Sequence, residues 1–92
     1  MYSVVIDTVA TGNNIRSLLD KNKVRVKDFY PIFGFTTPQA CYKWFNGVSL
    51  PTIDNFIIIS AFFGVPIDDI VVKEIKEVAN ENKGHETVRK AK

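Results

Sequence analysis

The sequence lacks the features that stabilise or anchor a small chain by means other than a packed core. Its single cysteine, Cys41, cannot form an internal disulfide, and no Cys/His cluster has the spacing of zinc ligands. The longest apolar run, residues 56–67, contains Ser60 and is too short to span a bilayer. The N-terminus has neither a basic segment nor a signal-peptide cleavage pattern. These absences predict a reduced, cytoplasmic domain that binds no metal and no membrane.

Features of enzymatic sites are also scarce. The sequence has no nucleophile–base pair and no Gly-rich phosphate loop, and the adjacent Asp68 and Asp69 look like first-turn helix residues. His85 has no metal-binding companion and is interpreted as a solvated side chain. We therefore predict no enzymatic activity, no cofactor and no small-molecule ligand.

What is present describes one small globular domain. The chain has 92 residues, of which 46% are hydrophobic and 24% charged, enough for one core but not two. The net charge of +2 is low for a nucleic-acid-binding protein. Four basic residues nevertheless fall between positions 21 and 27, namely Lys21, Lys23, Arg25 and Lys27. This cluster fits a solvated turn between helices as well as it fits a patch that faces phosphates.

The first third of the chain predicts an arm followed by two helices. Residues 1–10 favour β structure and form an extended arm that is able to pair as a short strand. Thr11 is the expected N-cap of a first helix that ends near Lys21. A second helix is expected over residues 26–33, kinked by Pro31 and ended by Gly34.

Three more helices are expected in the remainder. Thr37 and Pro38 predict the start of a third helix, residues 38–46, and Thr52 caps a fourth that ends at Phe63. A fifth helix opens at Pro66 and continues to residue 79, because apolar residues recur at helical spacing and Asp69 and Lys73 are four residues apart.

The predicted fold class is thus all-α, a compact bundle of five helices with an extended N-terminal arm and a charged C-terminal tail. Its expected divisions are an arm over residues 1–10, the helical domain over residues 11–79 and a flexible polar tail over residues 80–92.

The order and spacing of several short motifs match a known family. They are Gly12 with Ile15-Arg16 and Leu18, Gly34-Phe35, Tyr42-Lys43-Trp44 with Gly47, Leu50-Pro51, Ile53-Asp54-Asn55, Ser60, Gly64-Val65, Ile67-Asp68 and Ile70. Through them, residues 11–72 resemble the Cro and phage-repressor-like helix-turn-helix domains of the XRE family. The resemblance covers about two thirds of the chain.

The resemblance implies binding to double-stranded DNA, with the third helix in the major groove. Gln39 and Lys43 then share the face that reads base edges, where Gln suits adenine and Lys suits guanine. Thr37 and the loop that contains Ser49 match positions that contact the DNA backbone. The full set implied for DNA binding is Arg25, Lys27, Thr37, Gln39, Tyr42, Lys43, Asn46 and Ser49. Cys41 matches a buried aliphatic position and is interpreted as a small core residue.

Three departures from the family pattern bear on that contact map. Arg25 and Val26 stand where the family usually has Ser or Thr followed by Gln, so Arg25 or Lys27 would supply the phosphate contact instead. The stretch from Gly34 to Gly47 is one residue longer than the common pattern, which leaves two registers for Gln39 that differ by one position. Phe45 replaces a frequent acidic residue, and Pro31 disturbs the second helix.

The fourth helix is apolar on two faces. If residues such as Phe56 and Ile59 face the core, the opposite face carries Ile57, Ile58, Ala61 and Phe62. An exposed apolar patch of this kind is covered by the arm, by the fifth helix or by a second subunit. We predict a homodimer with these four residues at its interface, acting as a small bacterial or phage-type transcriptional regulator, in particular a repressor. The alternative is a protein-interaction module that keeps the helix-turn-helix scaffold without binding DNA.

Overall fold

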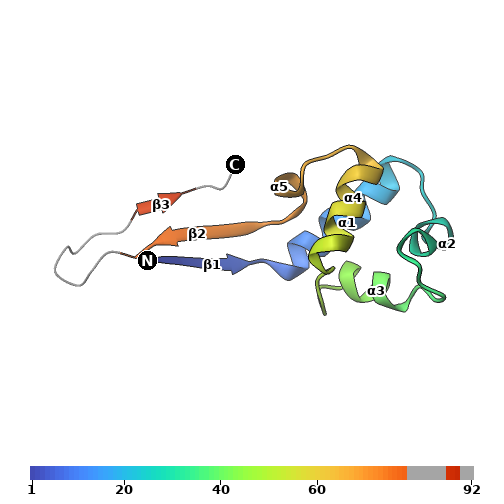
Figure 1. The fold of residues 1–92 in the computed structure, drawn as a ribbon, viewed down its shortest axis with the longest axis horizontal. Helices are drawn as coiled ribbons and strands as arrows, with labels where there is room; N and C mark the ends of the chain where they lie inside the picture. The colour runs from blue at the N-terminus through green and yellow to red at the C-terminus, as the bar shows by residue number, and fades with distance from the viewer. Residues whose placement is uncertain (79–86, 90–92) are drawn as a thin grey trace.

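The computed structural model of the chain describes residues 1–78 and 87–89, which form a helical body with a β-ribbon extending from it (Figure 1). The elements, in chain order, are β1 (Tyr2–Ile6), α1 (Thr8–Lys21), α2 (Val26–Phe29), the 3₁₀ turn η1 (Tyr30–Phe33), α3 (Gln39–Phe45), α4 (Ile53–Phe63), α5 (Ile67–Ile70), β2 (Lys73–Glu77) and β3 (Thr87–Arg89). The helical elements surround the core, and the strands lie outside it.

The core of the body receives side chains from all five α-helices. The buried apolar residues are Ile15, Leu19, Phe29, Cys41, Trp44, Phe45, Phe56, Ile59 and Ile70. Phe29 is fully buried, and its ring centroid lies 6.4 Å from that of Phe45 and 6.0 Å from that of Phe63. This arrangement of large side chains supplies the apolar burial that stabilises the body.

The α1 helix packs against the end of α3 through Gly12. A Cβ atom on Gly12 would overlap the carbonyl oxygen of Trp44, so this close approach requires glycine. This contact sets how closely the C-terminal end of α3 approaches α1.

The start of α1 differs from the prediction. Asp7 is the N-cap, and its Oδ1 accepts a hydrogen bond of 2.9 Å from the N–H of Ala10. Thr11, the predicted cap, lies inside the helix and is fully buried. Its Oγ1 accepts a 3.0 Å hydrogen bond from the N–H of Val72 and so joins α1 to the segment that leads into the ribbon.

The expected kink at Pro31 is confirmed. The α2 helix ends at Phe29, and η1 continues the chain as a 3₁₀ turn with Pro31 near its start. Gly34 ends this turn with a φ of 78°, a left-handed conformation that glycine adopts without strain.

The prediction of a mostly helical domain is confirmed, but the fold is not all-α, because a three-stranded antiparallel sheet extends from the helices. The predicted fifth helix is also wrong beyond Ile70, since α5 is a single turn and Lys73–Glu77 form β2. Val71 and Val72 are β-branched, and the pairing offered by the arm outweighs the helical spacing of the apolar residues. Lys73 consequently pairs with Asp68, at 3.3 Å, rather than with Asp69.

The sheet has the order β1-β2-β3, with β2 in the centre. The arm pairs as a strand, as the sequence allowed, and sets Val4 opposite Ile75. Part of the predicted flexible tail, Thr87–Arg89, pairs with β2 as β3. Residues 79–86 and 90–92, over which the rest of that prediction falls, lie outside the described residues.

Candidate nucleic-acid interface

The helix-turn-helix consists of α2 with η1, a turn over residues 34–38, and α3. The third helix starts one residue later than predicted, with Pro38 at the N-cap and no side-chain hydrogen bond to its first amides. Thr37 therefore does not cap α3, which corrects the sequence prediction. Because the turn is enlarged, Thr37 stands before the cap position, and its side chain is exposed.

The inward face of α3 is fixed by aromatic packing. Cys41, Trp44 and Phe45 are buried, at the spacing of one helix face. The Trp44 ring meets Phe33 edge-on at 5.1 Å and Phe35 at 5.8 Å. Phe33 precedes the turn and Phe35 lies within it, so the packing sets the rotation of α3 about its axis and determines which residues point outward.

Four of the predicted DNA-binding residues gather at one open hollow. Gln39 and Lys43, one turn apart on α3, line it together with Thr37 and Ser49 from the flanking loops. All four are exposed, so their polar groups are available to a ligand. Thr36 lines the same hollow and was missed by the sequence analysis, although the extra residue in the turn was a signal that more of this segment would face the site.

Tyr42 lies on α3 and Asn46 is its C-cap, and neither residue lines the hollow. Tyr42 is 47% exposed, and its ring meets Phe45 edge-on at 5.7 Å. Asn46 ends the helix, and its backbone N–H donates to the carbonyl of Tyr42. Both side chains are accessible from solvent at the border of the α3 surface.

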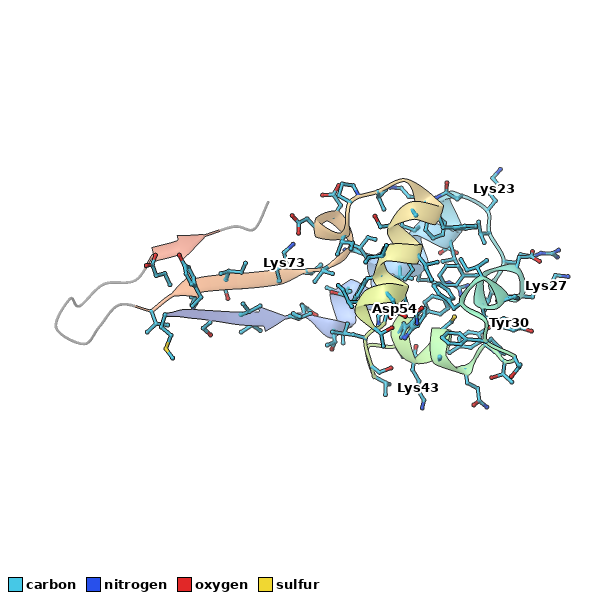
Figure 2. All side chains as sticks on the ribbon, viewed as in Figure 1. Lys23, Lys27, Tyr30, Lys43, Asp54 and Lys73 are labelled. Carbon is cyan, nitrogen blue, oxygen red and sulfur yellow. The ribbon has the colours of Figure 1, made fainter. Side chains whose placement is uncertain are left out.

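The basic cluster is separate from the hollow. Figure 2 shows Lys43 pointing from α3 toward the bottom of the view, whereas Lys23 and Lys27 point outward at the right-hand end of the body. Arg25 is exposed, with its Nε 3.7 Å from Oδ2 of Asp28, a weak surface ion pair. The structure therefore places Arg25 and Lys27 on the α2 side of the motif, apart from the residues that line the hollow.

Cys41 is a core residue, as expected, and not a reactive group. It is fully buried, and burial raises the pKa of its thiol from 9.0 to about 11. Among residues 1–78 and 87–89, no three His, Cys, Asp or Glu side chains are grouped so that they could hold a metal ion.

The outer face of α4 stays open to solvent in the described part of the chain. Ile57 is 54% exposed and Phe62 48%, with Ala61 exposed and Ile58 half-buried between them. The arm does not cover this face because it pairs with β2, and α5 ends after one turn. None of the described helices has the length and hydropathy of a membrane span.

A family model described as helix-turn-helix matches residues 15–70, from Ile15 within α1 to the end of α5. The matched segment contains the whole of the α2–turn–α3 arrangement and leaves out the β-ribbon. No curated protein and no solved structure matches the chain.

Proposed function

Since the chain belongs to the helix-turn-helix family of Cro-like and phage-repressor-like DNA-binding domains, we propose that it is a small transcriptional regulator that reads duplex DNA with α3. A repressor is the simplest form of this activity, because a protein bound at an operator blocks access to it. The proposed place of action is the cytoplasm.

The observation that carries this proposal is the hollow beside α3. Gln39 and Lys43 line it from the helix, and Thr37 and Ser49 line it from the two loops. A base reader on the helix with backbone contacts on either side is the arrangement by which such motifs fix their register on DNA.

Each side chain has a chemistry suited to a part of the duplex. The Gln39 amide can donate to and accept from adenine in the major groove, and the Lys43 ammonium can donate to guanine acceptors or to a phosphate. Thr37 and Ser49 offer hydroxyl donors to phosphates, and Tyr42 and Asn46 border the same surface.

Arg25 and Lys27 complete the proposed set from the α2 side. They are exposed, and their charge is accessible to the DNA backbone where it passes the second helix. Arg25 stands at the N-cap of α2, and no side-chain hydrogen bond caps that helix.

The test separates phosphate contact from base reading. Phosphate contact is measured by fluorescence anisotropy with a pool of random DNA duplexes at two salt concentrations. We expect binding to weaken steeply with salt, and Lys43→Ala to lower the affinity by about 10-fold if the lysine contacts DNA. Lys76→Ala is the matched control, because Lys76 is an exposed lysine on β2 and its loss changes the net charge equally.

Base reading is then measured on duplexes selected from the same pool. Gln39→Ala should lose affinity for the selected site and keep its affinity for random duplexes, because it removes a base contact only. Absence of binding at low salt contradicts the regulator proposal. Equal losses for Lys43→Ala and Lys76→Ala contradict the placement of DNA on α3.

We also propose that two copies associate through the outer face of α4, formed by Ile57, Ile58, Ala61 and Phe62. This proposal is supported by the exposure of large apolar side chains on α4 among the described residues. A second subunit would cover these side chains. A two-fold dimer would present two α3 helices to a palindromic site. Ile57→Lys should lower the mass in sedimentation velocity if this face is the interface, whereas Val48→Lys, at an exposed apolar position outside α4, should not.

The same face favours the alternative function, a module that binds another protein. In that case the α4 surface would contact a different chain, and the departure at Arg25 and Val26 would reflect loss of DNA contact. Salt distinguishes the two functions, because an apolar protein interface is far less salt-dependent than binding to several phosphates.

A further inference from the structure

A cavity of about 270 Å³ opens between α1, the turn that follows α4, and α5. It shares no lining residue with the hollow beside α3, and none of the proposed DNA-binding residues lines it. Figure 1 shows α5 at the place where the helical body meets the ribbon. A cavity of this volume suits a molecule smaller than the usual drug-sized ligand.

Two hydrogen bonds hold the walls of this cavity in place. Nδ2 of Asn14 donates to the carbonyl of Ile70 at 3.0 Å and so joins α1 to the end of α5. The hydroxyl of Ser60 donates to the carbonyl of Val65, which fixes the turn that follows Gly64. Because the protein's own contacts set the walls, the cavity is formed before a ligand enters, and this lowers the entropic cost of binding.

The polar side chains that line the cavity are available to a ligand. Ser17, Lys21 and Asp69 are exposed, and their side chains make no hydrogen bond or ion pair with other residues in the described part of the chain. Asn14 uses its Nδ2 to bond to α5, and its Oδ1 accepts no hydrogen bond from the same residues. The cavity thus offers both donors and acceptors.

The two charges that line the cavity have opposite signs and do not neutralise each other. Lys21 ends α1 and Asp69 lies in α5, and no ion pair joins them among the described residues. The neighbouring Asp68, in contrast, pairs with Lys73 at 3.3 Å. A ligand that carries both a carboxylate and an ammonium group can pair with both charges at once.

The remaining lining is aliphatic and comes from Leu18, Val65 and Ile70. Leu18 and Val65 are half-buried, and Ile70 is buried. A short branched aliphatic group on the ligand would remove apolar surface from water here.

We propose that this cavity binds a free aliphatic α-amino acid, with its carboxylate on Lys21 and its ammonium group on Asp69. Oδ1 of Asn14 accepts a further hydrogen bond from the ammonium group, and the hydroxyl of Ser17 donates one to the carboxylate. An amino acid bound in this way joins α1 to α5. The sequence analysis predicted no small-molecule ligand because the segments that form the cavity are far apart in the chain.

The test uses L-leucine and two analogues that each lack one charge. L-leucinamide keeps the ammonium group without the carboxylate, and isocaproic acid keeps the carboxylate without the ammonium group. In heteronuclear NMR titrations of the full chain at neutral pH, L-leucine should shift the amide signals of Ser17, Lys21 and Ile70 until the site is saturated. Each analogue should bind about 10-fold more weakly, because one charge-assisted hydrogen bond is lost.

Two variants assign the two charges to their residues. Lys21→Met should bind L-leucine no better than L-leucinamide, and Asp69→Asn should bind L-leucine no better than isocaproic acid, because each variant removes the partner of one charge. Lys76→Met and Glu74→Gln, at exposed positions on β2, are the matched controls and should bind L-leucine as the wild type does.

Three results would overturn the proposal, whatever the DNA-binding result. The first is the absence of saturable shifts with L-leucine, and the second is equal affinity of the wild type for L-leucine and both analogues. The third is a Lys21→Met or Asp69→Asn variant that keeps the full preference for L-leucine, since the charge in question would then pair elsewhere.

Discussion

The helical body and the β-ribbon contain similar proportions of apolar residues and bury them to very different degrees. In α4, Ile59 is fully buried and Phe56 nearly so, and both meet residues from other helices in one core. In β1, which is almost entirely apolar, each of the five residues is exposed. Hydrophobic composition therefore does not separate the two regions.

The two regions differ in the number of layers of secondary structure that pack against one another. Helices approach the core of the body from several directions, so the apolar side of each is covered by the others. The ribbon is a single sheet whose β1 strand has no layer over it in the described residues, and a small sheet of this kind is marginal on its own. The body thus has the means to hold a binding surface rigidly, whereas the ribbon gains most from contact with another molecule.

The largest expected effect is the difference in stability lost when a side chain is truncated in the body and in the ribbon. Phe29→Ala empties the centre of the aromatic core and should lower the free energy of unfolding by about 4 kcal/mol. Val5→Ala, at an exposed ribbon position, should cost less than about 1 kcal/mol. Urea denaturation followed by circular dichroism measures both. Losses of similar size would show that the ribbon belongs to the same core as the helices.

A smaller effect is expected at the junction of the two regions. Thr11→Val keeps the shape of the side chain but leaves the N–H of Val72 without its acceptor, which should cost about 2 kcal/mol. Thr11→Ser is the control, because it restores the hydroxyl. Amide exchange at Val72 should accelerate in the valine variant only. Unchanged exchange in that variant would mean that the hydrogen bond does not hold the ribbon to α1.

Much of the body was predictable because local signals and packing agree there. The break at Pro31 and the inward face of α3 follow from the fixed φ of proline and from helical spacing. The helix start at Asp7 was missed because Thr11 is also a favourable cap by residue type, although its buried hydroxyl bonds to Val72 instead.

The ribbon was not predictable in the same way. Ile70, Val71, Ile75 and Val78 fit a helical period, and only the presence of β1, more than sixty residues earlier, makes β2 a strand.

At the candidate site, the sequence identified Gln39 and Lys43 as neighbours on one face, and both line the hollow. The place of Thr36 beside them depends on the path of the longer turn, which residue spacing does not determine.

The smallest expected effect is a pH dependence of stability that arises from Cys41, a residue of the body. Burial raises its pKa to about 11 from 9.0, so the unfolded chain loses the thiol proton at a lower pH than the folded protein does. The folded state then binds more protons, and stability falls as the pH rises above 9.0. Between about pH 8 and pH 10 the loss amounts to roughly 1.3 kcal/mol. Urea denaturation at several pH values should show this decrease in the wild type and a smaller one in Cys41→Ala, which shares every other titrating group. Identical pH dependence in the two proteins would show that the thiol is as accessible to water in the folded body as in the unfolded chain. The contrast between a buried core in the body and an exposed ribbon would then not hold at Cys41.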